Sequence, residues 1–224
     1  MTDVRAQKLI KKIPIPTYTF GEELINTISH GLGAILGVAA LTLCLVRSVF
    51  HQSGYAVASS IVFGLSLIIL YSMSAIYHGV RPSIVKRILR ICDHCTIFLL
   101  IAGSYTPFTL ITLRGPVGWT LFGIIWTMAI VGIILNVIDL ERFKKLSMGC
   151  YLVMGWCVVF TFPTLVANLS STGLKLLIAG GIAYTVGAVI FGIGSKVKYM
   201  HSLWHFFVLA GSILHFLCIF SHVI

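Results

Sequence analysis

Seven apolar stretches, each about as long as a membrane span, make up most of this 224-residue sequence. A helix needs about 20 apolar residues to cross the hydrocarbon core of a bilayer. Because lipid cannot hydrogen-bond a bare backbone, such runs form helices or a closed barrel, and these runs lack the alternation of barrel strands. The sequence therefore predicts an all-α polytopic membrane protein, a seven-transmembrane helix bundle. Its expected spans are roughly 24–47, 54–78, 92–113, 117–138, 147–168, 174–194 and 202–222.

The composition predicts one membrane domain that uses nearly the whole chain. Hydrophobic residues make up 58% of the sequence and charged residues only 10%, whereas soluble domains are about 45–50% apolar. The connections between the runs are short. We therefore expect a short basic N-terminal segment, 1–21, followed by a single seven-helix transmembrane domain, 22–224.

The basic residues predict the direction of the chain through the membrane. All but three of the 16 Lys and Arg residues lie at the N-terminus or in the second, fourth and sixth connections. The exceptions are Arg47, Arg114 and Lys175. Since cytoplasmic loops carry an excess of Lys and Arg, we expect a cytoplasmic N-terminus and an external C-terminus. This distribution also explains the net charge of +10 without a nucleic-acid partner, because no continuous basic surface would form.

Ionisable side chains gather at the cytoplasmic ends of three predicted spans. His78 ends the second span, Asp93 begins the third, and His201 and His205 begin the seventh. Charged or ionisable groups inside a membrane segment are costly, and they therefore mark functional sites by default. A lone intramembrane histidine is often only a hydrogen-bonded helix contact, but four such groups at one depth indicate a shared site.

The residue types at this depth are those that Zn²⁺ accepts. His201 and His205 are one helical turn apart on one face, and His78 would supply a third nitrogen from another helix. Three protein ligands leave a fourth position for water, whose pKa a zinc ion lowers from 15.7 to about 7. Asp93 is then a candidate catalytic residue that holds this water or accepts its proton. Ser74, one turn before His78, is a candidate to orient the imidazole or donate to a developing oxyanion.

The first span brings a polar face to the same end. Glu22, Asn26 and His30 follow one another at four-residue intervals, so they share a helix face. We expect them to support the metal ligands or to contact substrate. For His30 a plain helix–helix contact is an equal alternative.

Several motifs in this sequence together resemble those of the progestin and adipoQ receptor family, and within it the bacterial hemolysin III branch. They occur in family order over all but the middle helices. The matching residues are Glu22-Glu23 with Asn26, Ser29 and His30; the Ser-x-x-x-His element of Ser74 and His78; Asp93-His94; Gly103-Ser-Tyr-Thr-Pro107; and His201-x-x-x-His205.

This resemblance implies a fold, a cofactor and an activity. It implies seven helices with zinc held by His78, His201 and His205, Asp93 contacting the metal through water, and Ser74 beside it. The wider superfamily is associated with zinc-dependent hydrolysis of lipid amides or esters. The bacterial branch is named after a haemolytic effect and has been linked to membrane lipid homeostasis. A multi-pass protein of the bacterial plasma membrane, with a membrane lipid as substrate or ligand, is therefore expected.

Three functions are consistent with these features. The first is a metal-dependent hydrolase of a lipid amide or ester. The second is a cytolytic or pore-forming protein, and the third is a receptor-like regulator with a structural zinc site. A conducting pore needs polar lining through both leaflets, whereas here the ionisable residues gather in the inner half. The two histidines in the outer half of the last span, His215 and His222, indicate either interhelical hydrogen bonds or a polar path for protons or substrate.

Small residues on the first span indicate close helix packing. Gly33 and Gly37 form a small-xxx-small face, the pattern by which membrane helices approach each other closely. The partner helix is either a neighbour within the chain or the same face of a second copy. A homodimer is therefore a further expectation.

Overall fold

Helices and short connections make up the residues that the computed structural model describes, which are 13–51, 53–194 and 197–224, with no strand among them. Three short segments continue the main helices: the π-helices Phe108–Leu113 and Ile219–Val223 and the 3₁₀-helix Cys157–Thr161. The α-helices are α2 (Phe20–Phe50), α3 (Gly54–Gly79), α4 (Ile84–Pro107), α5 (Gly115–Trp156), α6 (Phe162–Asn168), α7 (Ser171–Gly194) and α8 (Met200–Cys218). The predicted all-α class is confirmed. The basic residues expected at the start of the chain, Arg5, Lys8, Lys11 and Lys12, lie outside the described residues.

Six helical segments of the described chain are long and apolar enough to cross a membrane. They leave many large apolar side chains exposed along their length, among them Phe50 and Phe160 at 82% and 87%. Contiguous exposed apolar surface of this extent is typical of contact with lipid. The segments are Phe20–Phe50, Gly54–Gly79, Ile84–Leu113, Gly115–Asn168, Ser171–Gly192 and Met200–Val223.

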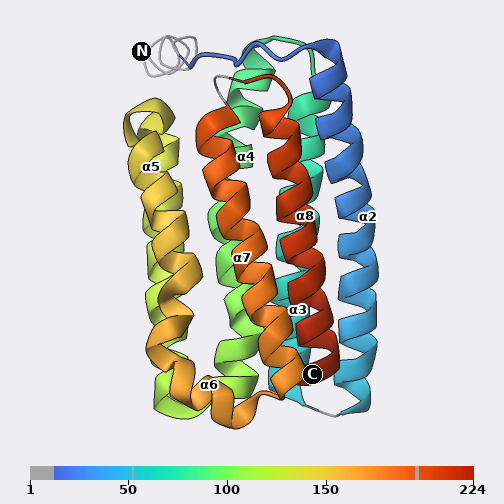
Figure 1. Ribbon diagram of the computed structural model, residues 1–224, viewed down its shortest axis with the longest axis vertical. Coiled ribbons are helices and arrows are strands. Elements are labelled where there is room, and N and C mark those ends of the chain that lie inside the picture. Colours follow the sequence, from blue (N-terminus) through green and yellow to red (C-terminus); the bar gives the residue numbers. More distant parts are fainter. Residues whose placement is uncertain (1–12, 52, 195–196) are drawn as a thin grey trace, which may run out of the picture.

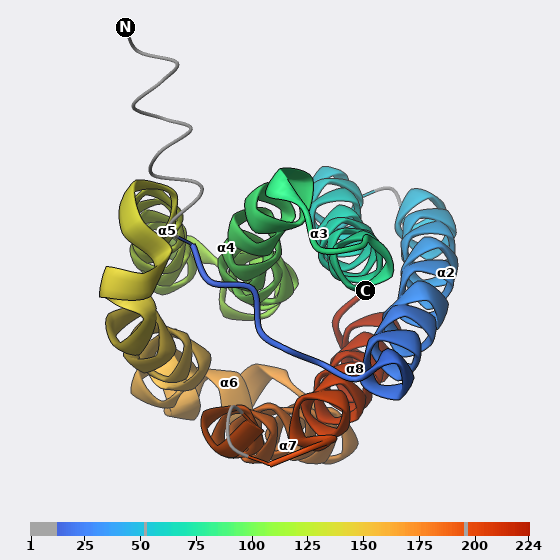
Figure 2. The same cartoon turned by 90° about the horizontal axis from the view of Figure 1, so that it is seen from above.

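The longest of these segments changes direction at Asp139. The backbone of Asp139 is extended, with φ −160° and ψ 92°, in the middle of α5. The Asp139 carboxylate accepts a hydrogen bond of 3.1 Å from the Arg142 backbone N–H, as an N-cap residue does. Two legs of α5 therefore run side by side in opposite directions (Figures 1 and 2). The predicted spans 117–138 and 147–168 fall on either side of this turn.

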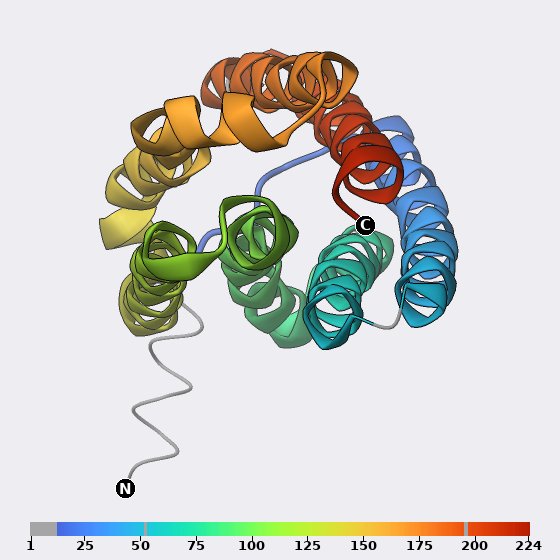
Figure 3. The same cartoon turned by 90° about the horizontal axis from the view of Figure 1, so that it is seen from below.

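The helices stand in a ring. Viewed along their axes, α2, α3 and α4 follow one another around the ring, the legs of α5 come next, and α7 and α8 complete it beside α2 (Figure 2). At the opposite end, α6 leads from the second leg of α5 to α7 (Figure 3). Residues 13–19 cross the ring at the end where α2 and α8 begin (Figure 2). This end also holds the cluster of histidines.

The helix that holds the third predicted span begins before that span. It was expected at 92–113, but α4 already begins at Ile84, because the Ser83 hydroxyl caps it by accepting a 3.2 Å hydrogen bond from the Lys86 N–H. Lys86, Arg87 and Arg90 are therefore helical residues and not part of a connection. Hydropathy misses these two turns because their charged residues lower the local average. Lys86 and Arg90 are nevertheless buried, at 1% and 3% exposure.

The glycine face of α2 packs within the chain. A Cβ atom on Gly33 would lie 2.6 Å from the Tyr71 ring, and one on Gly37 would lie 3.2 Å from Ile68, both on α3. This face therefore packs closely against α3 inside the bundle. The expected homodimer stays a prediction, and this face offers it no support.

We expect Gly33→Ala to lower the free energy of unfolding by about 1–3 kcal/mol, since its methyl group overpacks the contact with Tyr71. Gly31→Ala is the matched control, because a Cβ there meets nothing within 4 Å. This control should leave stability unchanged or raise it by up to about 1 kcal/mol, as alanine favours helix. Unfolding in detergent measures both. Equal effects of the two substitutions would show that the α2–α3 contact is not tight at Gly33.

Candidate metal centre

Three buried histidines from two helices meet at one end of the ring. His78 stands in the last turn of α3, while His201 and His205 occupy the first two turns of α8. Their exposed fractions are 2%, 6% and 0%. One ligand atom from each lies within 4.8 Å of the other two. Since α3 ends where α8 begins, residues 123 positions apart come into contact.

The spacing of the three nitrogens fits a tetrahedral ion. The Nε2 atoms of His78 and His201 are 3.3 Å apart, and those of His201 and His205 are 3.2 Å apart. Zn–N bonds of 2.0–2.1 Å in a tetrahedron separate neighbouring ligand atoms by about 3.3–3.4 Å. The predicted ligand set is therefore brought together, and its chemistry and spacing fit a metal ion.

A glutamate on α2 orients the His78 ring. The carboxylate Oε2 of Glu23 lies 2.6 Å from His78 Nδ1 and accepts its proton in a hydrogen bond. This contact selects the tautomer in which Nε2 carries the lone pair, and that lone pair faces His201. The ammonium group of Lys86 holds Glu23 in turn, at 2.7 Å from Oε1, and also donates to the carbonyl oxygens of His78 and Val80.

The four-residue spacing predicts this supporting role for Glu22 and not for Glu23. In the structure the Glu22 carboxylate accepts hydrogen bonds from Thr19 and from the Tyr199 N–H at 2.7 Å, so it anchors the loop before α8. Glu23 has a spacing signal of its own, since residues 23, 26 and 30 follow the i, i+3, i+7 pattern of one helix face. Nothing in the sequence alone pairs Lys86 with this face.

We expect Glu23→Gln to weaken zinc binding about 10–100-fold, the usual cost of removing a hydrogen-bond partner of a metal-bound histidine. The amide keeps the size of the side chain but loses the charge that faces His78 and Lys86. Glu22→Gln is the matched control and should change zinc affinity by less than about 3-fold, because Glu22 contacts no zinc-ligand candidate. Competition with a fluorescent zinc chelator measures both. A weaker effect of Glu23→Gln than of Glu22→Gln would remove Glu23 from the site.

The other predicted site residues surround the histidines without joining them. Asp93 is 5% exposed and Ser74 is 1% exposed, and both line the cavity described below. Asp93 is absent from the set of close donor atoms found in the described chain. The Asn26 amide nitrogen lies 3.4 Å from His78 Nδ1.

Aromatic rings enclose the histidine cluster. The His30 ring stacks on His205 with centroids 3.7 Å apart, so it packs against a ligand candidate. Tyr18, from the segment that crosses the ring, stacks on His201 at 4.9 Å. Trp204 lies 5.0 Å from His205. These rings pack against the imidazoles and restrict their rotation.

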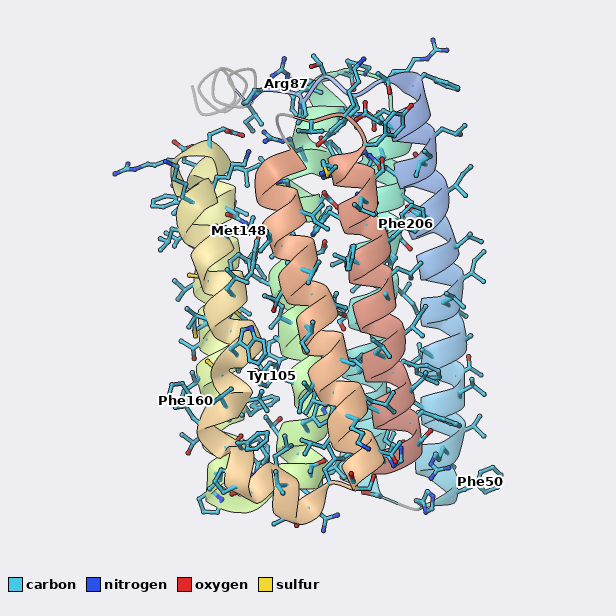
Figure 4. The ribbon with its side chains drawn as sticks, viewed as in Figure 1. Phe50, Arg87, Tyr105, Met148, Phe160 and Phe206 are labelled. Carbon is cyan, nitrogen blue, oxygen red and sulfur yellow. The ribbon has the colours of Figure 1, made fainter. Side chains whose placement is uncertain are left out.

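A cavity of about 180 Å³ lies inside the ring, and it is lined in part by His30, whose ring packs against His205. His30, Ser74 and Asp93 line one end of it, and apolar residues line most of the rest. Figure 4 shows two of its lining residues, Met148 and Tyr105, at different depths between α5 and α7. A cavity with this mostly apolar lining matches an acyl chain better than a polar solute.

The two outer histidines make ordinary hydrogen bonds between helices. His215 Nε2 lies 3.2 Å from the Leu177 carbonyl oxygen of α7, and His222 Nδ1 lies 2.8 Å from the Ser170 hydroxyl. This supports the first of the two interpretations drawn from the sequence. His215 also lines the cavity, at the end away from the histidine cluster.

Fold and site together define a class of protein: a multi-pass helical membrane protein with three buried histidines that are able to bind a metal ion. The family model described as Haemolysin-III related matches residues 18–216, which include all three histidines. The chain belongs to this family. The resemblance found in the sequence is thereby confirmed.

Relatives match along most of the chain. The hemolysin-3 of Bacillus cereus is 44% identical over 216 residues, 96% of this chain and 98% of that protein. The hemolysin-3 homolog of Bacillus subtilis (strain 168) is 40% identical over 207 residues, 92% and 97% of the two chains. The monocyte to macrophage differentiation factor of Homo sapiens is 29% identical over 168 residues, 72% and 69% of the two chains. The expected localisation, a multi-pass protein of a bacterial membrane, agrees with these findings.

Proposed function

We propose that this protein is a zinc-dependent hydrolase of a lipid amide or ester that contributes to membrane lipid homeostasis. One observation carries the proposal: a buried site that fits a three-histidine metal centre lies beside an apolar cavity with a carboxylate on its wall. A lipid substrate explains why such a site lies among membrane helices. Zinc is the metal that best suits three imidazoles and an open fourth position.

The side chains around the site divide the chemistry of hydrolysis between them. A bound zinc ion supplies a Lewis acid that polarises a carbonyl oxygen and activates water. Asp93 accepts the proton that water loses as its oxygen bonds to the carbonyl carbon, and returns this proton to the leaving nitrogen or oxygen. The C–N or C–O bond breaks, and a fatty acid and an amine or alcohol leave. The Ser74 hydroxyl donates to the negative charge that develops on the carbonyl oxygen.

The membrane topology belongs to this proposal. We infer seven spans, because the segment Gly115–Asn168 has 54 residues, about twice the length that one crossing needs, and turns at Asp139. The bias of Lys and Arg then gives a cytoplasmic N-terminus and an external C-terminus. A reporter active only outside the cytoplasm, fused after Ile224, should be active. Activity of a cytoplasmic reporter at the same position would reverse the orientation.

A cytolytic function is the second candidate, favoured by the name of two bacterial relatives, hemolysin-3 and its homolog. In a lytic protein the histidines and their metal would only join α3 to α8. A receptor-like regulator would use the metal in the same structural way. The apolar lining of the cavity favours the hydrolase over a conducting pore.

Reconstitution of the purified protein in liposomes tests these candidates together. The liposomes contain lipid amides and acyl esters and enclose a self-quenched dye. Fatty acid release by the zinc-loaded protein, absent from His78→Ala, is the result the hydrolase predicts. Dye release without fatty acid would favour the lytic function. If no lipid gives more fatty acid with the active protein than with His78→Ala, the hydrolase is wrong.

A further inference from the structure

A second cavity, of about 700 Å³, lies at the histidine end of the ring and is lined by basic side chains. We call it the vestibule. The segment 16–19 forms one wall, and the second leg of α5 and the loop before α8 form others. Its lining includes four cationic residues, His94 and the ligand candidate His201. The cationic residues are Arg90, Lys144, Lys145 and Lys198.

Part of this positive charge has no paired carboxylate. Arg90 is paired with Glu141 at 2.5 Å and donates to the Pro14 carbonyl oxygen. Across 13–51, 53–194 and 197–224, no carboxylate forms a salt bridge with Lys144, Lys145 or Lys198. The acid in the vestibule wall is Glu22, whose carboxylate lies close enough to Lys198 to offset part of its charge and leaves Lys144 and Lys145 without such a partner. The vestibule thus holds an excess of positive charge.

The vestibule and the apolar cavity adjoin each other at the metal centre. Met148 and Phe191 line both. Asp93 lines the apolar cavity and the next residue, His94, lines the vestibule. An amphiphile is therefore able to lie with its chain in the cavity, its carbonyl beside the histidines and its head group among the lysines.

The positive-inside pattern explains why this end of the protein is basic, but it does not explain why the vestibule cations gather in one cavity. Arg81 and Arg142 lie at the same end of the ring, are exposed, and do not line the vestibule. Lys144 and Lys198 come from α5 and from the loop before α8, so two distant segments bring their charges to one cavity beside His201.

We propose that the vestibule binds the phosphate group of an anionic lipid. A phosphate offers several charged oxygens to surrounding ammonium and guanidinium donors, which matches this wall better than a neutral head group. That this lipid is the substrate rests on the proposed hydrolase. Binding of the phosphate group does not depend on turnover.

Calorimetric titration of the purified zinc-loaded protein tests this with ligands that it cannot hydrolyse. The probes are di-O-hexyl glycerol phosphate, di-O-hexyl glycerol and inorganic phosphate. We expect the lipid phosphate to bind at least about 10-fold tighter than either of the other two, because it alone occupies both cavities. Equal affinity for the two lipids would overturn the proposal. Equal affinity for lipid phosphate and inorganic phosphate would assign the vestibule to the free anion and overturn the lipid head group.

Two double variants separate the vestibule from surface charge. Lys144→Gln/Lys198→Gln should lower the affinity for the lipid phosphate about 10-fold or more. Arg81→Gln/Arg142→Gln removes the same charge from the same end and should stay within about 2-fold. Equal losses in both would show surface attraction only and overturn the proposal. Zinc content reports whether each variant is folded.

The two proposals fail in different ways. A head-group preference that depends on Lys144 and Lys198, without any fatty acid release, would support the vestibule and reject the hydrolase. Fatty acid release that is equally fast from neutral and phosphate-bearing lipids, with no binding preference, would support the hydrolase and reject the vestibule.

Discussion

His78→Ala is expected to lose the metal. Purified active protein should hold about one zinc ion per chain, and the variant less than about one-tenth of that. Zinc sites of 10–16 kcal/mol over four ligands give about 3 kcal/mol per ligand, so loss of one imidazole costs at least about 100-fold in affinity. Hydrolysis should disappear with the metal. Elemental analysis of the purified protein measures the zinc.

The control for this variant is a histidine outside the cluster. His222→Ala removes one imidazole that bonds to Ser170, far from His201 and His205 in the chain. It should keep its zinc and its activity. If His78→Ala retained stoichiometric zinc, or if both variants lost it alike, the three-histidine site would be refuted.

Asp93→Asn is expected to separate metal binding from catalysis. The amide keeps the size of the side chain but cannot accept a proton at neutral pH, so turnover should fall about 10²–10⁴-fold. Zinc content should stay unchanged, because Asp93 lies outside the close set of nitrogen donors. A turnover assay on the reconstituted protein, run beside zinc analysis, measures both quantities.

Asp139→Asn provides a matched control at the turn of α5. Asparagine caps a helix about as well as aspartate, so fold and activity should persist. Full turnover by Asp93→Asn would end the role of Asp93 as proton acceptor. Parallel loss of zinc and activity would make Asp93 a ligand instead.

The apolar runs predicted the elements of the fold because membrane helices carry a strong length signal. The predicted contact between His78, His201 and His205 follows from their shared depth. Because successive spans run in opposite directions, the end of α3 and the start of α8 lie at the same side of the membrane. The direction of the helices, and not a local motif, determines this contact. Residues 123 positions apart needed no motif to connect them.

Hydropathy and spacing missed contacts that depend on helix rotation. The start of α4 at Ile84 was hidden by its charged first turns. The choice between Glu22 and Glu23 depends on rotation by one residue, about 100° around α2. The burial of Lys86 against Glu23 joins α4 to α2, and no local pattern marks it.

X-ray absorption at the zinc edge of the purified protein is the most direct test of the metal centre. We predict three imidazole nitrogens and one further light ligand at about 2.0–2.1 Å, and loss of the bound-zinc signal itself in His205→Ala. Sulfur at about 2.3 Å, or a spectrum that His205→Ala leaves unchanged, would contradict it.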